Sequence, residues 1–66
     1  MSSVYTATAT REGRWWVISV PAVDGVTQAL HLDDVAQAAA ELVAVTLDVP
    51  VDDVRIEVVM ASGDDR

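Results

Sequence analysis

The hydrophobic period of this chain changes twice, from that of a strand to that of a helix and back again. Residues 4–10 and 54–60 alternate between two kinds of side chain, which is the period of a strand with one face buried. Residues 32–48 instead place apolar side chains three and four positions apart, which is the period of an amphipathic helix. We therefore expect one helix in an otherwise β-rich chain.

A β-hairpin is expected at the start of the chain. Its first strand spans residues 4–10, and its second strand spans residues 14–20, which are rich in tryptophan, valine and isoleucine. Gly13 lies between the two strands and can adopt the positive φ that a tight turn requires.

Proline and glycine delimit the next segment. Pro21 has no N–H to donate to a sheet, so it ends the second strand. Residues 22–25, which close with Gly25, predict a turn. Residues 26–30 then predict a short third strand that runs antiparallel to the second.

The helix is predicted over about residues 32–48. Two aspartates at its start suit the positive end of the helix dipole, and the cap residue is either His31 or Asp33. Pro50 disfavours helical geometry at the residue before it, so the helix should end at about Asp48.

The predicted order of elements is strand, strand, strand, helix, strand (β-β-β-α-β), which defines an α+β fold. We expect the fourth strand to pair in parallel with the first, which gives a four-stranded mixed sheet of order 3-2-1-4. The helix should pack on one face of that sheet, because neither element can bury its apolar side alone. Residues 1–66 are enough for one domain only, ordered over about 4–60.

Two adjacent tryptophans must point to opposite faces of that sheet. The helix can cover Trp16 but not Trp15, and tryptophan is a frequent anchor of protein–protein interfaces. The alternative is that Trp15 lies on the sheet surface, partly shielded by threonines. We predict an interface with a partner protein or a second copy that contains Trp15, Val17, Thr6, Thr8 and Ala29.

The small size of the chain also favours self-association. A domain of this length has a marginal core, which disulfides, metals or oligomerisation usually support. The sequence has no cysteine and one histidine, so the first two supports are not expected. A homo-oligomer, a dimer or larger, is the remaining expectation.

The charge balance narrows the class of partner. Eleven acidic residues against four arginines give a net charge of −7, which opposes binding to a phosphate backbone and suits a basic protein. No apolar run is long enough to span a membrane, and the first residues do not resemble a signal peptide. We therefore expect a cytoplasmic protein with no membrane partner.

No catalytic or cofactor-binding motif is evident. The acidic pairs Asp33–Asp34 and Asp52–Asp53 flank the predicted helix and are about 24 Å apart, too far to share a metal ion. His31 is the one side chain suited to acid–base chemistry at neutral pH, but its place before the helix favours a capping or surface role. We expect a non-enzyme without metal or cofactor, and keep a minimal hydrolase that uses His31 as the alternative.

Residues 13–29 resemble the N-terminal domain of HicB-type antitoxins. The matching features are an aromatic strand, Pro21, Gly25 and a small third strand containing Thr27-Gln28, followed by Leu32-Asp33-Asp34-Val35-Ala36 at the helix start. The resemblance covers about residues 4–60. It implies a partial ribonuclease-H-like fold and a non-catalytic module that neutralises a small basic HicA-type mRNA-cleaving toxin by covering it.

Two departures from the family pattern qualify what the resemblance implies. Typical members continue into a DNA-binding domain, whereas this sequence stops at Arg66, so direct DNA binding is not expected. Asp24 stands where many relatives have a second proline, and Val26 where many have cysteine. The chain also resembles stand-alone, orphan members of the family, so the alternative is a homo-oligomeric domain without a toxin partner.

Overall fold

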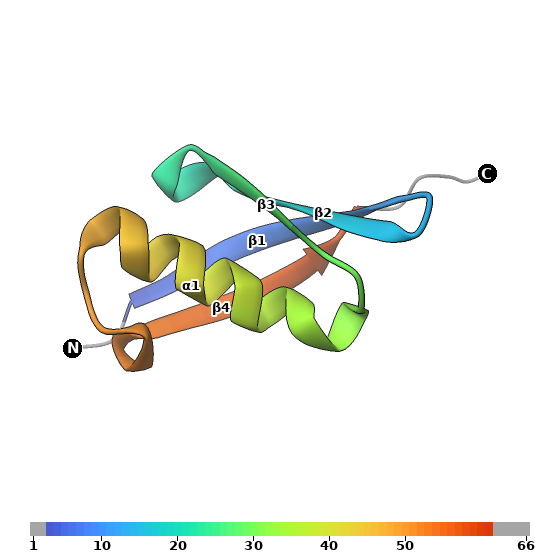
Figure 1. Cartoon of the computed structure of the whole chain (residues 1–66). Coiled ribbons are helices and arrows are strands. Elements are labelled where there is room, and N and C mark those ends of the chain that lie inside the picture. The colour runs from blue at the N-terminus through green and yellow to red at the C-terminus, as the bar shows by residue number, and fades with distance from the viewer. Residues whose placement is uncertain (1–2, 62–66) are drawn as a thin grey trace.

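The computed structural model describes residues 3–61. Four strands, one α-helix and three short 3₁₀ segments form this part of the chain (Figure 1). They are β1 (Ser3–Glu12), β2 (Trp15–Val20), η1 (Pro21–Val23), β3 (Gly25–Ala29), η2 (Leu32–Asp34), α1 (Val35–Leu47), η3 (Val51–Asp53) and β4 (Val54–Met60).

The strands form one mixed sheet of order β3-β2-β1-β4. The pairs β1–β2 and β2–β3 are antiparallel, whereas β1 and β4 are parallel. The predicted α+β class, the strand order 3-2-1-4 and the single helix are therefore confirmed. The helix packs along one face of the sheet (Figure 1).

The hairpin turn lies where the glycine predicted it. Gly13 has a φ of 63°, in the left-handed region that side chains with a Cβ disfavour. The first strand extends further than the alternation indicated, because Glu12 still pairs with Trp15 at the end of the hairpin, whereas the second strand begins at Trp15, one residue later than predicted. Arg11 supports the turn, since its Nε donates a hydrogen bond to the carbonyl oxygen of Gly13 at 2.9 Å.

The connection between β2 and β3 is more regular than the predicted turn. Pro21 begins the 3₁₀ segment η1, and Asp24, with a φ of 52°, adopts the left-handed conformation at its end. Gly25 is instead the first residue of β3 and lies against the helix. A Cβ built on Gly25 would be 3.0 Å from Cδ2 of Leu42, so glycine permits a close approach there.

The helix begins later than predicted because its first turn is 3₁₀. His31 precedes η2 and Asp34 precedes α1, and neither side chain makes a capping hydrogen bond. At the other end Asp48 has a φ of 58°, and the N–H of Val49 donates to the carbonyl oxygen of Ala44 at 3.0 Å. This left-handed ending stops the helix close to the predicted position.

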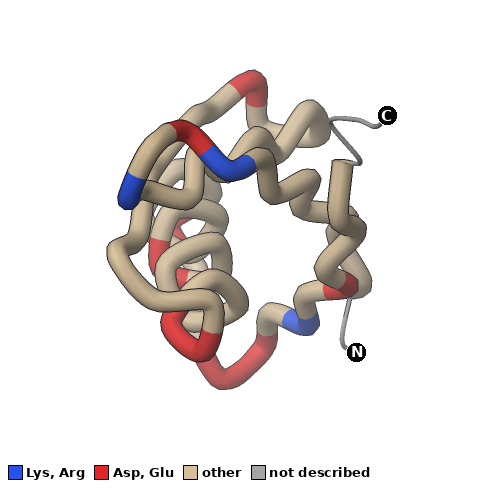
Figure 2. Tube along the Cα trace, turned by 90° about the vertical axis from the view of Figure 1, so that its right-hand side faces the viewer, with Lys and Arg blue, Asp and Glu red and all other residues tan. Residues whose placement is uncertain are grey.

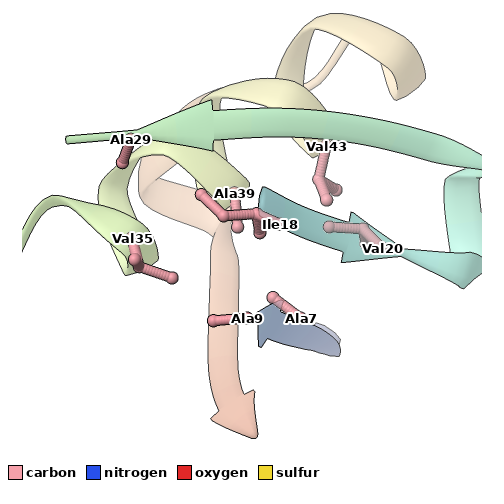
Figure 3. Packing of buried hydrophobic residues seen from close by; sticks show 8 residues of the cluster. All are labelled: Ala7, Ala9, Ile18, Val20, Ala29, Val35, Ala39 and Val43. Atoms are coloured by element: carbon pink, nitrogen blue, oxygen red, sulfur yellow. The ribbon is translucent and has the colours of Figure 1, made fainter. Parts of the chain in front are cut away.

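The core lies between the sheet and α1 and consists of small aliphatic side chains. Its largest fully buried members are two valines of the helix and a valine and an isoleucine of β2. Alanines fill the centre of β1 and the middle of the helix, so the two layers pack closely. Figure 3 shows the eight residues of this cluster: Ala7, Ala9, Ile18, Val20, Ala29, Val35, Ala39 and Val43.

Candidate functional site: the open face of the sheet

The face of the sheet opposite α1 is the candidate site, because no described element packs over it (Figure 1). We call it the open face. The strand registers and the alternation of side chains define its members. They are Val4, Thr6, Thr8, Thr10 and Glu12 of β1, Trp15, Val17 and Ser19 of β2, Val26 and Gln28 of β3, and Arg55, Glu57 and Val59 of β4.

Two uncharged rows cross the centre of the open face. In the first row, Thr8 lies opposite Ser19 on one side and Val59 on the other, and Ser19 in turn lies opposite Val26. The second row runs from Thr10 through Val17 to Gln28. Trp15 continues β2 beyond this second row, opposite Glu12, so the indole borders the uncharged centre.

Large apolar side chains are solvent-exposed on this face. Trp15 exposes 41% of its surface, Val26 66% and Val59 43%, whereas Val17 is half-buried among its neighbours. Threonine and serine fill the spaces between them, and Thr8 and Ser19 are also half-buried. The centre of the open face is therefore an uncharged surface of apolar and hydroxyl side chains bordered by a tryptophan, and few charges beside an aromatic residue are typical of the core of a protein–protein interface.

The structure brings together four of the five residues predicted to form an interface. Trp15, Val17, Thr6 and Thr8 all lie on the open face. Ala29 does not, and its assignment to that interface is corrected. It pairs with Trp16, faces the helix and is only 8% exposed, so it belongs to the core.

The two tryptophans are divided between the faces as their adjacency predicts. Trp16 is half-buried on the helix side and packs against the core. Cζ of Arg11 lies 5.4 Å from the centroid of its ring, within the range of a cation–π contact. Trp15 has no such cover within residues 3–61, and its indole remains the largest exposed apolar group of β2.

Val26 and Val59 belong to the site but were not among the predicted interface residues. Val59 could have been found by extending the alternation of β4 past Glu57. Val26 could not, because β3 places Thr27 toward the helix and the valine toward solvent. The hydrophobic pattern of this strand is therefore inverted relative to its burial.

Most of the acidic charge lies away from the open face. Figure 2 shows that acidic positions outnumber basic ones around the trace. The open face itself carries Glu12 at one end and Arg55 with Glu57 at the other. Six further acidic residues lie on α1 or in the segments that flank it: Asp33, Asp34, Glu41, Asp48, Asp52 and Asp53.

The candidate residues for hydrolysis lie at the two ends of the helix. The acidic pairs lie in η2 and η3, at opposite ends of the helix. His31 is exposed at the start of η2. Residues 3–61 contain no pocket and no cluster of three or more histidine, cysteine, aspartate or glutamate side chains placed to hold a metal ion.

Comparisons with protein-family models, with curated proteins and with solved structures find no match. The resemblance to HicB-type antitoxins and to a ribonuclease-H-like fold therefore stays a prediction from the sequence. Within the described part of the chain, the one α-helix is too short to cross a bilayer.

Proposed function

We propose that this chain is a non-catalytic protein-binding module that holds its partner on the open face. The observation that carries this proposal is the exposed indole of Trp15 beside two uncharged rows of threonine, serine and valine. A tryptophan that is already ordered by a strand contributes contact area at little further entropic cost, which makes it an effective anchor.

The proposed partner is a small basic protein of the HicA type, as the family resemblance implies. The acidic residues of α1 and its flanking segments belong to the side of the sheet that the helix covers, so we do not expect them to contact a partner bound at the centre of the open face. They instead give the whole molecule a negative field, which speeds the encounter with a basic protein and weakens as salt is added. Binding should therefore combine salt-dependent association with apolar contact.

Covering the toxin is the proposed mechanism of neutralisation. The open face can occlude the cleft of a bound nuclease without any chemistry of its own. We place the complex in the cytoplasm, where a toxin that cleaves mRNA would act. An orphan role, in which a second copy of this chain covers the same face, is the alternative outcome of the tests below.

The experiment pairs two substitutions that introduce the same side chain at different places. Thr8→Arg puts a cation in the centre of the open face, and Ala36→Arg puts one on the exposed side of α1. The tagged full chain and both variants are used to capture proteins from the native host. We expect a small basic protein with the wild type and with Ala36→Arg, and its loss with Thr8→Arg.

The function of the captured protein is then tested by expressing it alone and together with this chain. We expect arrested growth and cleaved mRNA when it is alone, and normal growth when the two are co-expressed. Rescue should fail with Thr8→Arg. Equal capture by all three forms, or a captured protein without effect on growth, would contradict the antitoxin proposal.

The contribution of the indole is measured with the purified partner. Trp15→Ala should weaken binding by about 30-fold or more, the effect of losing a hot-spot tryptophan. Val45→Ala removes an exposed apolar side chain from the helix and serves as the matched control. An unchanged dissociation constant for Trp15→Ala would exclude the open face as the binding surface.

A further inference from the structure

The outer edge of β4 carries backbone groups that no described strand pairs. β4 is the last strand of the order β3-β2-β1-β4, so it has a neighbour on one side only. The N–H of Ala61 donates to the carbonyl oxygen of Ala9 at 2.9 Å, which fixes the hydrogen-bonding phase of the β1–β4 pair.

That phase decides which groups of β4 point outward. In a parallel pair, alternate residues direct both their N–H and their C=O toward the neighbouring strand. Because the backbone N–H of Ala61 is directed toward β1, the N–H and C=O groups of Arg55, Glu57 and Val59 are directed toward β1 as well. The N–H and C=O groups of Val54, Ile56 and Val58 are therefore directed away from the sheet.

This edge lacks most of the features that normally prevent further pairing, and the two charges that it carries, Arg55 and Glu57, are of opposite sign. Natural edge strands are blocked by proline, by a bulge or by an inward-pointing charge. β4 contains no proline or glycine, and it pairs with β1 through seven successive residues without a bulge. Its inward-facing side chains Val54, Ile56 and Val58 are apolar and only half-buried, so the core is open at this edge.

The sequence of β4 is complementary to itself in the antiparallel direction. With a two-fold axis at Ile56, Arg55 lies opposite Glu57 of the second copy, and Val54 lies opposite Val58 of the second copy. Each ion pair then joins the open faces of the two copies, while valines and isoleucines meet on the helix side. Facing residues with opposite charges stabilise a strand pair, whereas like charges destabilise it.

Other registers fit less well. If the two-fold axis lay between two residues, a residue whose N–H and C=O point outward would face a residue whose groups point toward β1, and no hydrogen bonds could form. Only an axis centred on a residue therefore allows the two strands to pair. An axis at Arg55 sets two arginines against each other, and an axis at Glu57 does the same with two glutamates. An axis at Val58 leaves both charges opposite uncharged residues.

We propose that a second copy of this chain pairs with the outer edge of β4, antiparallel and centred on Ile56. The outward N–H and C=O groups of Val54, Ile56 and Val58 then pair with those of Val58, Ile56 and Val54 of the second copy. The two sheets join into one continuous sheet, and the two-fold axis is perpendicular to it. The open faces of both copies lie on the same side of this sheet and remain free to bind a partner. The proposed dimer therefore uses a different surface from the proposed function and does not depend on it.

The test measures the dimerisation constant of the full chain by analytical ultracentrifugation. Arg55→Glu and Glu57→Arg each replace both ion pairs by like charges, and each should weaken the dimer by at least about 10-fold. Glu41→Arg makes the same change of charge on α1 and should leave the constant unchanged. Circular dichroism checks that every variant keeps its fold.

A mixture of the two charge-reversed chains gives the decisive test. When the Arg55→Glu and Glu57→Arg chains are combined, each carries the charges that the other needs, so a heterodimer should form at concentrations where either alone is monomeric. The double variant Arg55→Glu/Glu57→Arg should dimerise as well as the wild type, and it settles the question if a single variant does not fold.

Several results would overturn the proposal. A monomeric wild type, a Glu57→Arg chain that dimerises normally, or a mixture that stays monomeric would each do so. A dimer that Thr8→Arg abolishes and Glu57→Arg leaves intact would place the second copy on the open face instead. Loss of toxin binding with an intact β4 dimer would affect only the proposed function.

Discussion

The two faces of the sheet differ in what covers them, although the same strands supply both. On β2, Ile18 and Val20 are fully buried against α1, while Trp15 and Val17 on the opposite face remain exposed or half-buried. The strand has more apolar surface than one 13-residue helix can cover. A chain of this size has a free energy of unfolding of only about 3–10 kcal/mol, and the surface that stays exposed contributes little to it. We propose that the apolar part of this surface serves binding.

The comparison is tested most strongly by neighbouring residues of β2. Ile18→Ala should lower the free energy of unfolding by about 2–5 kcal/mol, because it leaves a cavity under the helix. Val17→Ala should cost about 1 kcal/mol or less in a dilute sample. Urea unfolding of both variants measures the difference, and equal losses would mean that the open face is covered even in the free chain.

The helix provides a second contrast of this kind. Ala39 is fully buried against the sheet and Ala36 is exposed, so Ala39→Leu should overpack the core and destabilise by about 1–3 kcal/mol. Ala36→Leu should change the stability by less than about 0.5 kcal/mol. Thermal unfolding resolves the two effects, and a neutral Ala39→Leu would show that the layers are further apart than described.

The hairpin turn sharpens the comparison because it sets the register of β2. A slip by one residue would exchange the faces of Trp15 and Trp16. Gly13→Ala places a Cβ on a residue with positive φ and should cost about 1 kcal/mol of stability. Gly13→Asn should cost less stability, since asparagine tolerates this conformation. Urea unfolding ranks the two variants against the wild type. Equal stability of the wild type and both variants would argue against the left-handed turn.

The smallest expected effect concerns Arg11. Its guanidinium lies over Trp16 and its Nε holds the turn, so Arg11→Gln should cost about 0.5 kcal/mol. The change should also alter the fluorescence of Trp16, measured in a Trp15→Phe background. Arg14→Gln, at the neighbouring turn position, is the control. Identical Trp16 emission from Arg11→Gln and Arg14→Gln would show that Arg11 makes no cation–π contact with Trp16.

The sequence was sufficient to predict the fold because its periods are strong. Residues 4–10 and 54–60 alternate clearly, and the helix is bounded by aspartates and Pro50, so strand order followed from simple pairing rules. The face of β3 was not predictable in this way. Val26 points to solvent and Thr27 toward the helix, so only the pairing with β2 reveals that Ala29 is buried.

The sequence also could not predict the conformation of the second turn or the buried face of the helix. The predicted turn over residues 22–25 is a 3₁₀ segment that ends with a left-handed Asp24, and Gly25 is already the first residue of β3. The helical period places Ala36 and Ala39 on the apolar face, but only Ala39 is buried against the sheet, Ala36 is exposed, and Ala40 and Ala44 are buried instead. Both outcomes depend on contacts between elements far apart in sequence.

The central claim is that the partner binds on the open face. NMR of the ¹⁵N-labelled chain with its captured basic partner tests this claim most directly. The indole N–H signals of Trp15 and Trp16 report separately on the two faces of the same strand. We predict that the Trp15 signal and the amides of Val17 and Val59 shift on binding, while the Trp16 indole and the outer residues of α1 do not. Shifts confined to α1, with an unchanged Trp15 indole, would contradict the account.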